Sequence, residues 1–322
     1  RVAGAAAREI LIKAAADEWQ VSTSELTAEN SYIVHAASGQ RGEFAQFAQA
    51  AAQMTPSHTP TLKKPRDFKI MGQSVARLDI PAKVDGTAQF GIDAVLPGMK
   101  HAAIMGAPVF GAQVVSFDAD TARQMAGVVD VISLDNAVAV VAEGYWQAKQ
   151  ALKAVQVEWS KTGHEKVSSE TLFVQFEKDL QNARENGSAG EDVVVGDTAA
   201  AFAQADRVVE ATYKVPFLAH TTMEPMNATA QVVDDQIEVW VGSQNPLGFR
   251  HEVADALGVD AAQVTLHQHM MGGGFGRRAT GDVAVQAARL AQATGVPVKL
   301  IWSREEDVRH DIYRPAVASQ FR

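Results

Sequence analysis

Four glycines fall within the five residues Gly272-Gly273-Gly274-Phe275-Gly276, and this cluster restricts the fold more than any other feature of the chain. Glycine adopts positive φ without a steric penalty, so the cluster favours a tight loop over a continued helix or strand. Residues 263–268 before it predict a strand, and residues 282–293 after it predict a helix that ends at Gly295. Backbone N–H groups in such a loop can face an oxo group, a phosphate or a pyrophosphate, and Phe275 could cover a planar ligand.

Two familiar phosphate-binding loops do not fit these residues. A P-loop needs Lys-Ser or Lys-Thr after its last glycine, whereas Arg277-Arg278 follows here. A dinucleotide fingerprint needs two residues between its second and third glycines, and Gly274 and Gly276 leave one. A nicotinamide-dependent dehydrogenase is therefore disfavoured. A tight structural turn without any ligand remains an alternative for this loop.

Gln244 is a second candidate for ligand contact. Ser243-Gln244-Asn245-Pro246 follows a predicted strand, and Pro246 suits the first turn of a predicted helix over 247–257. An amide at the end of a strand can donate to an oxo ligand and accept from a hydroxyl. The alternative is a turn amide that caps the helix.

Three other polar clusters favour structural roles. His220-Thr-Thr-Met-Glu224-Pro225-Met-Asn227 lacks the arrangement of a metalloprotease site and predicts a hydrogen-bonded turn. His267 and His269 would share one face of a strand, but no third ligand lies nearby in the sequence, so we predict no metal site. The charged run 304–311 predicts a solvated helix with i,i+4 ion pairs, which Ser303 and Glu306 begin as a capping box.

Composition places the chain among globular proteins of more than one domain. It has 322 residues, 47% of them hydrophobic, and a formal net charge of −9, which gives no general attraction to nucleic acid. It contains no cysteine, so it can form no disulfide and ligate no iron–sulfur cluster through cysteine. We find no apolar run that could cross a membrane.

The predicted elements indicate an α+β fold. Prolines at 56, 60 and 65 predict a linker over 55–74. The other predictions are helices over 1–19, 44–54, 121–125, 145–152 and 169–182, and strands over 31–35, 88–92, 101–105, 128–133, 137–142, 155–159, 207–215, 229–233, 236–241 and 296–302. In the helix over 145–152, Trp146 is expected to face the hydrophobic core of its domain.

The order of these motifs resembles the molybdenum hydroxylases, the xanthine dehydrogenase and aldehyde oxidase family. Within that family the chain is similar to the large (beta) subunit of isoquinoline 1-oxidoreductase and to bacterial aldehyde dehydrogenases. The stretches that carry the resemblance are Arg77-Leu-Asp-Ile-Pro-Ala-Lys-Val-Asp-Gly86, 220–227, Ser243-Gln244-Asn245, the glycine loop with Arg277-Arg278, and Val298-Lys-Leu-Ile-Trp-Ser-Arg-Glu-Glu-Asp307 continuing to Tyr313-Arg-Pro315.

The resemblance implies a domain layout. Residues 1–54 match the tail of an N-terminal molybdopterin-binding portion, and 55–74 a linker. Residues 75–160 match an α/β hammerhead domain, and 161–191 a second linker with an exposed helix. Residues 192–322 match the first part of a molybdopterin-binding domain.

The resemblance also implies a site and a cofactor. Gln244 corresponds to the glutamine that hydrogen-bonds a molybdenum oxygen. Gly273, Gly274, Phe275, Gly276 and Arg277 correspond to the loop that contacts molybdopterin, which is expected in its cytosine dinucleotide form. No side chain of this chain is expected to ligate a metal. The implied reaction hydroxylates an aldehyde or an N-heteroaromatic compound with oxygen from water.

Partners follow from the same resemblance. The iron–sulfur clusters would lie on a small two-iron two-sulfur subunit, and a cytochrome c is a candidate electron acceptor. Exported relatives indicate a periplasmic or periplasm-facing, membrane-associated location, with the cytoplasm as the alternative.

The chain also departs from the family pattern. The glutamate that acts as general base in the family has no matching motif here, and the segments before Arg1 and after Arg322 are missing relative to the family. Arg277-Arg278-Ala279 replaces the pattern of the purine-oxidising branch, which argues against purine substrates. We therefore expect a fragment of a larger subunit, with an isolated, folded but inactive piece as the alternative.

Overall fold

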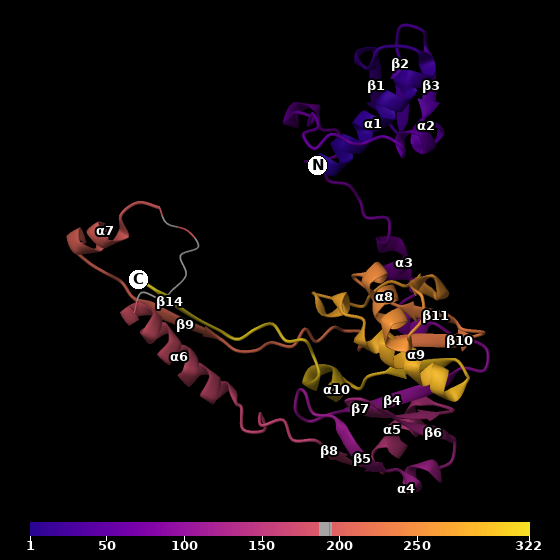
Figure 1. The fold of residues 1–322 in the computed structure, drawn as a ribbon, viewed down its shortest axis with the longest axis vertical. Coiled ribbons are helices and arrows are strands. Elements are labelled where there is room, and N and C mark those ends of the chain that lie inside the picture. The colour runs from indigo at the N-terminus through magenta and orange to yellow at the C-terminus, as the bar shows by residue number, and fades with distance from the viewer. Residues whose placement is uncertain (187–192, 194) are drawn as a thin grey trace. The chain divides into compact units, whose positions relative to one another are not determined.

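The computed structural model describes residues 1–186, 193 and 195–322, which form two compact units, Arg1–Ile80 and Pro81–Arg322 (Figure 1). The boundary between the units falls within the short helix α3 (Ile80–Asp85). Residues 187–191 of the predicted second linker lie outside the described residues.

The first unit packs two helices against a small antiparallel sheet. Its elements in chain order are α1 (Val2–Trp19), β1 (Leu26–Glu29), β2 (Tyr32–His35), β3 (Gln40–Glu43) and α2 (Phe44–Ala51). Phe47 is fully buried, and its ring meets Trp19 edge to face with the centroids 5.3 Å apart. Both helices and β2 were predicted from apolar periodicity, whereas β1 and β3 were not, because each buries a single residue.

A seven-stranded mixed sheet forms the centre of the second unit. The strand order is β12-β11-β10-β13-β4-β7-β6. Their bounds are β4 (Lys100–Gly106), β6 (Val128–Leu134), β7 (Ala137–Ala142), β10 (Asn227–Val233), β11 (Gln236–Val241), β12 (Val264–Gln268) and β13 (Val298–Ile301). β13 and β4 pair in parallel. Strands from the predicted hammerhead range and from the predicted cofactor-binding range therefore share one sheet.

Helices cover both faces of this sheet (Figure 1). They are α4 (Asp120–Arg123), α5 (Tyr145–Leu152), α8 (Pro246–Leu257), α9 (Asp282–Thr294) and α10 (Arg304–Arg309). Alternate residues of β7 belong to different apolar clusters, one with α8 and α9 and the other with α5, so every residue of β7 is buried.

The turns and helix ends follow their local chemistry. Asp234 and Asp235 both have positive φ at the hairpin turn, as a two-residue hairpin loop requires. Gly258 and Gly295 end α8 and α9 in the left-handed conformation. The predicted strand over 88–92 is wrong: only Phe90 forms an isolated bridge, with Met270, and a 3₁₀ turn follows over Gly91–Asp93. Trp146 is also misplaced by the prediction, since 69% of it is exposed.

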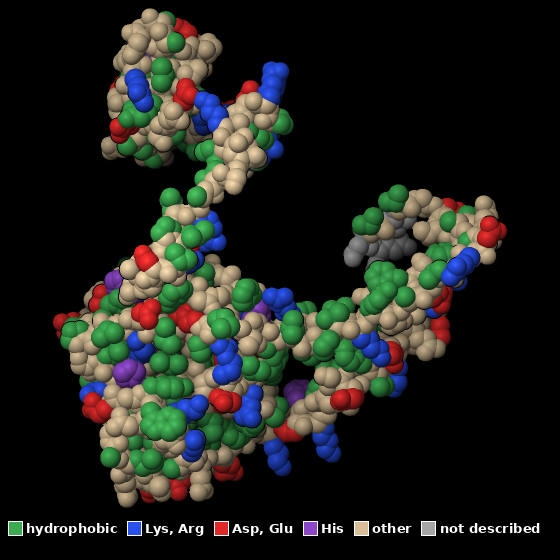
Figure 2. Space-filling model, turned by 180° about the vertical axis from the view of Figure 1, so that it is seen from behind, with side chains coloured by type: hydrophobic (Ala, Val, Ile, Leu, Met, Phe, Trp, Pro, Cys, Tyr) green, Lys and Arg blue, Asp and Glu red, His purple; other side chains and the backbone are tan. Residues whose placement is uncertain are grey.

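Two further strand pairs lie outside the central sheet. β5 (Val114–Asp118) pairs with β8 (Gln156–Trp159), and β9 (Ala211–Val215) pairs with β14 (Val317–Phe321). The predicted exposed helix is present as α6 (Ser169–Asn186), which buries none of its residues, and α7 (Thr198–Gln204) follows. Figure 2 shows hydrophobic side chains exposed along this segment. No helix among the described residues is both long and apolar enough to span a bilayer.

Candidate functional site

Gln244 and the glycine loop lie against each other. The Oε1 atom of Gln244 accepts a hydrogen bond of 2.9 Å from the N–H of Gly276, and its own N–H donates to the carbonyl of Arg278 at 2.8 Å. A Cβ atom at Gly274 would lie 2.6 Å from that Oε1, so only glycine fits there without movement. The structure thus brings together Gln244 and the loop, the two features that the sequence singled out.

The helix after Gln244 does not use its amide as a cap. Asn245 is the N-cap residue of α8, because its Oδ1 accepts from the N–H of Gly248 at 3.2 Å. Pro246 occupies the first turn, as predicted. The capping alternative for Gln244 is therefore wrong, and its Nε2 has no hydrogen-bond partner among the described residues.

The loop itself leaves donors free. In the described part of the chain, no protein acceptor pairs with the N–H groups of Gly273, Gly274 or Phe275. Phe275 has a φ of 54°, an uncommon conformation for an aromatic residue, and 64% of it is exposed. Free backbone donors beside a free amide suit a ligand rich in oxygen acceptors.

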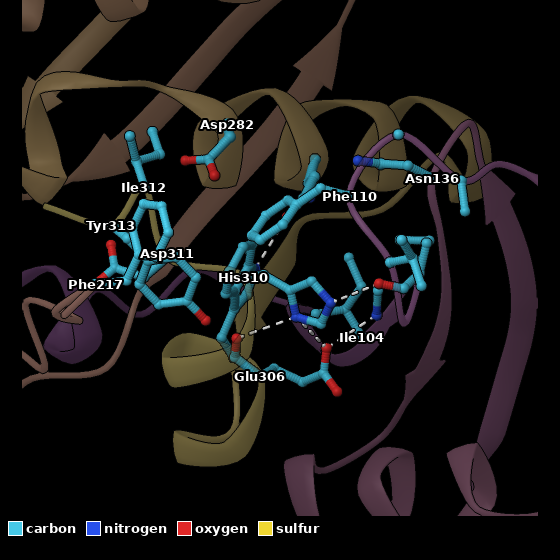
Figure 3. Close-up of a pocket in the computed structure, with 18 residues that line it drawn as sticks. Ile104, Phe110, Asn136, Phe217, Asp282, Glu306, His310, Asp311, Ile312 and Tyr313 are labelled. Carbon is cyan, nitrogen blue, oxygen red and sulfur yellow. Dashed lines mark hydrogen bonds and ion pairs between the residues drawn. The ribbon is translucent and has the colours of Figure 1, made fainter. Parts of the chain in front are cut away.

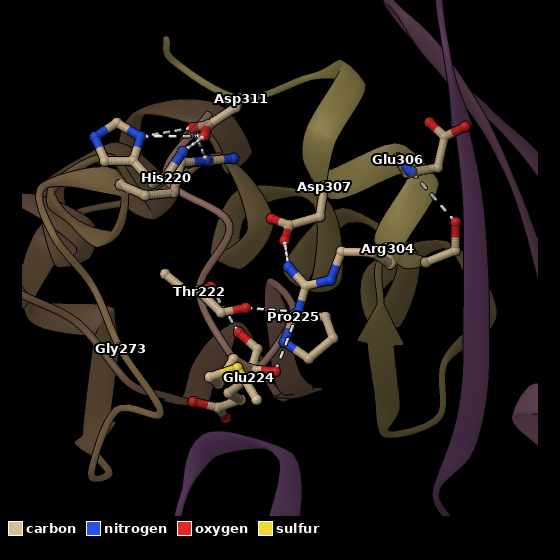
Figure 4. Close-up of polar contacts among 12 residues, drawn as sticks. His220, Thr222, Glu224, Pro225, Gly273, Arg304, Glu306, Asp307 and Asp311 are labelled. Carbon is tan, nitrogen blue, oxygen red and sulfur yellow. Dashed lines mark hydrogen bonds and ion pairs between the residues drawn. The ribbon is translucent and has the colours of Figure 1, made fainter. Parts of the chain in front are cut away.

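Glu224 anchors the base of the loop. Its carboxylate accepts from the N–H of Gly272 at 2.7 Å and from the N–H of Ile92 at 3.0 Å. It also accepts from Nδ2 of Asn227 at 2.9 Å and from Nη2 of Arg278 at 3.1 Å. The predicted hydrogen-bonded turn over 220–227 is confirmed, and part of it is drawn in Figure 4. The four donors leave the carboxylate of Glu224 with no acceptor capacity for a substrate.

Arg278 stabilises the same loop from inside the protein. It is fully buried, its Nε donates to the carbonyl of Gly273 at 2.9 Å, and burial lowers its pKa despite the charge of Glu224. Nη1 of Arg278 is buried without a partner in the described residues. No local pattern predicts this role, because the partners of Arg278 lie up to 54 residues away in the chain.

Arg277 is equally buried and faces a different set of groups. Its Nη1 and Nη2 donate to both carboxylate oxygens of Asp282, at 3.0 and 2.8 Å, and its Nε lies 3.2 Å from Oδ1 of Asp311. The guanidinium stacks over Trp302, 5.4 Å from the ring centroid. The side chain of Arg277 therefore holds the segment after the loop, while its predicted contact with a cofactor stays a prediction.

The charged run over 304–311 is only partly a solvated helix. Asp307 and Asp311 are 3% and 2% exposed, so the prediction is wrong for these two carboxylates. Arg304 pairs with Asp307 and donates to the carbonyl of Thr222 at 2.5 Å, which joins α10 to the 220–227 turn (Figure 4). Burial raises the pKa of Asp307.

A cavity of about 490 Å³ lies beside this network (Figure 3). Phe110, Phe217 and Tyr313 form part of its wall, and Asp282 and Asp311 reach it from the network around Arg277. His310 lines it too, with Nε2 3.0 Å from the carbonyl of Ala107 and Nδ1 3.0 Å from Oε2 of Glu306.

His267 and His269 show no metal-binding arrangement in the structure. His267 stacks on Trp240 with 4.5 Å between centroids, and its Nε2 lies 3.1 Å from Glu238. Among the described residues, no group of three His, Cys, Asp or Glu side chains could hold a metal ion.

Known proteins match this fold and this loop. Residues 180–322 match the family model described as the molybdopterin cofactor-binding domain. The chain is 30% identical to isoquinoline 1-oxidoreductase subunit beta of Brevundimonas diminuta, over 99% of this chain and 46% of that protein. It is 33% identical to a membrane-bound aldehyde dehydrogenase (pyrroloquinoline-quinone) of Gluconacetobacter polyoxogenes, over 98% of this chain and 42% of that protein.

Solved structures share the fold. The aldehyde oxidoreductase of Desulfovibrio gigas matches with a TM-score of 0.60 and 23% identity, over 81% of this chain and 33% of that one. Quinoline 2-oxidoreductase of Pseudomonas putida 86 matches with a TM-score of 0.57 and 23% identity, over 74% of this chain and 35% of that one. The chain spans less than half the length of these four proteins.

Residues 180–322 are therefore a molybdopterin cofactor-binding domain. Over nearly its whole length the chain is similar to the beta subunit of isoquinoline 1-oxidoreductase and to a bacterial aldehyde dehydrogenase, as its motifs predicted, and the predicted α+β class is confirmed. The assignment of residues 75–160 as a hammerhead domain stays a prediction.

Proposed function

We propose that this chain is the cofactor-binding part of a molybdenum-dependent oxidoreductase that hydroxylates aldehydes or N-heteroaromatic compounds with oxygen from water. The observation that carries the proposal is the contact between Gln244 and the glycine loop, where the Nε2 group of Gln244 and three backbone N–H groups have no acceptor in the part of the chain that the structure describes. The names of the relatives, which include isoquinoline, aldehyde and nicotinate enzymes, support the two substrate classes.

The residues present fit molybdopterin. Gly274 admits a side chain only if Gln244 moves, and among the described residues no partner occupies Nε2 of Gln244 or the N–H groups of Gly273, Gly274 and Phe275, which can donate to an acceptor-rich group. When bound, the cofactor supplies a Lewis acid and an electron acceptor. The chain would contribute orientation: Nε2 of Gln244 would donate to an oxygen of the bound group, and the exposed ring of Phe275 would be available to cover a planar part of it.

Further parts of the proposal concern the whole protein. We propose the cytosine dinucleotide form of the cofactor, a small two-iron two-sulfur partner subunit, and a cytochrome c as acceptor. The subunit names of the relatives support a multi-subunit enzyme. We also propose a periplasm-facing, membrane-associated location, for which the name of one relative, a membrane-bound aldehyde dehydrogenase, supports only the membrane association.

A second candidate is that the 322 residues alone bind cofactor weakly or not at all and catalyse nothing. The hydrogen bonding of Glu224 favours this alternative. Its carboxylate, which lies beside the loop, accepts four hydrogen bonds and is not free to act as a general base.

Molybdenum per chain, measured by elemental mass spectrometry beside an intact mass, tests the proposal. We expect near-stoichiometric molybdenum in the intact protein, together with aldehyde or N-heterocycle oxidation. Gln244→Ala should lower turnover and leave most of the cofactor bound. Absence of molybdenum from the intact protein would refute the proposal, and unchanged turnover of Gln244→Ala would remove Gln244 from the site.

A further inference from the structure

His220 lies beside the glycine loop, next to Gly276. Its Nε2 would be 3.4 Å from a Cβ atom at Gly276, where φ is +111°. The side chain is 9% exposed, and Nε2 has no partner among the described residues. A ring nitrogen is thus held close to the loop with its hydrogen-bonding capacity unused.

Asp311 fixes the orientation of this ring. The backbone N–H of His220 donates to the Asp311 carboxylate, and Nδ1 lies 3.0 and 3.1 Å from its two oxygens (Figure 4). Because a carboxylate can only accept, Nδ1 carries the hydrogen in this contact. Two contacts to one carboxylate prevent the ring from turning, so Nε2 must face the loop.

Arg277 in turn fixes Asp311. The two side chains are each 1% exposed, with 3.2 Å between Nε and Oδ1, and Arg277 is anchored on the other side by Asp282, the first residue of α9. Burying this many charges costs free energy that a hydrophobic packing would not. Such supporting contacts are typical of imidazoles that must be held in one orientation toward a ligand.

We propose that His220 is a positioning residue whose Nε2 hydrogen-bonds the molybdopterin group held by the glycine loop, while Asp311 and Arg277 set its orientation. This inference rests on the proposed function. Together with Nε2 of Gln244, Nε2 of His220 would then be a second side-chain nitrogen beside the loop that has no partner among the described residues.

Two substitutions separate this role from a structural one. In His220→Asn the amide reaches about as far as Nδ1, so it retains the contact to Asp311 and loses the group facing the loop. In His220→Gln the amide reaches about as far as Nε2 and can restore that group. The intact protein and both variants are incubated at one temperature below melting, and molybdenum retained per chain is followed with time, with melting temperatures measured in parallel.

We expect His220→Asn to lose molybdenum about tenfold faster than the wild type, which corresponds to one hydrogen bond of about 1.4 kcal/mol. His220→Gln should stay closer to the wild type. Equal loss from the two variants, loss only from His220→Gln, or retention by both would each overturn the inference, because a purely structural histidine is replaced at least as well by asparagine.

The two proposals fail in different ways. A wild-type protein without molybdenum refutes the proposed function, and the role of His220 with it. A loaded wild type whose His220→Asn variant keeps its metal refutes only the role of His220.

Discussion

At the scale of single residues, the loop depends on carboxylates that the sequence did not mark as buried. Glu224 joins three segments distant in the chain, through Ile92, Gly272 and Arg278. Its sequence neighbours predicted a turn, but no local pattern shows that a loop 48 residues later would donate to it.

Removing this carboxylate should destabilise the second unit. Glu224→Ala leaves the guanidinium of Arg278 buried without its charge partner, so we expect the free energy of unfolding to fall by about 3–5 kcal/mol. Glu224→Gln, which keeps one acceptor, should cost less. Urea unfolding measures both, with Glu185→Ala on the exposed helix α6 as the control; equal midpoints for Glu224→Ala and the control would contradict this account.

Gly274 tests the packing of the loop. In Gly274→Ala the new Cβ atom would meet Oε1 and Cδ of Gln244 at 2.6 and 2.9 Å, so Gln244 must move and the bond to Gly276 must break. We expect molybdenum per chain to fall while the fold persists. Gly4→Ala in helix α1 is the matched control, since nothing lies within 4 Å of its Cβ position, and it should be neutral or stabilising by up to about 1 kcal/mol.

At the scale of elements, the sequence pattern predicted the helices and strands that are determined by interactions between residues close in the chain. The hairpin of β10 and β11, the helices α8 and α9 with their terminal glycines, and the fully apolar strand β7 all appear as predicted. β5 and β14 were missed because their exposed residues carry no alternating apolar signal. Residues 88–92 look like a strand in the sequence. In the structure Gly91 packs so closely against Asn227 that a Cβ atom at Gly91 would lie 2.9 Å from Oδ1 of Asn227, and a contact between residues so distant in the chain leaves no local pattern.

The same argument applies to the site. Gln244 and the loop could be found from sequence because each is a short motif at the end of a strand. His220, Asp311 and Arg277 could not be joined, since the histidine and the aspartate are 91 residues apart.

The end of α8 offers a test at this scale. Gly258 has a φ of +70° with no atom within 4 Å of its Cβ position, so a side chain there meets backbone strain and no clash. Gly258→Ala should cost about 1 kcal/mol, and Gly258→Asn less, because asparagine tolerates this conformation. The melting temperatures of the two variants test this prediction. If Gly258→Ala is at least as stable as Gly258→Asn, backbone strain at this position is not what destabilises the alanine variant.

At the scale of the whole molecule, His310 ties α10 to the end of β4. Burial alone would lower the pKa of His310, whereas hydrogen bonds with Glu306 and the carbonyl of Ala107 raise it, and the net shift is above the ordinary value of 6.5. A raised pKa means that the folded state binds the proton more tightly than the unfolded chain does.

This linkage predicts a pH dependence of stability. The stabilising contribution of His310 is complete below the unfolded pKa of about 6.5 and is lost as the pH rises through the raised folded pKa. The stability difference between the wild type and His310→Gln should therefore shrink above neutral pH. Urea midpoints at several pH values measure it; a difference that grows with pH would reverse the sign and contradict the assignment. The raised pKa of Asp307 also favours the folded state at low pH. This second pH dependence of the free energy of unfolding should be the same in the wild type and in His310→Gln, so it cancels in their difference.

The parallel pairing of β4 with β13 has a consequence for biosynthesis. Lys100 pairs with Val298, about 200 residues later in the chain. At ribosomal rates of about 5–20 residues per second, one edge of β4 emerges roughly 10–40 seconds before its partner exists. An edge left open that long can recruit other nascent chains, so the interval between these two strands is when this protein most needs a chaperone.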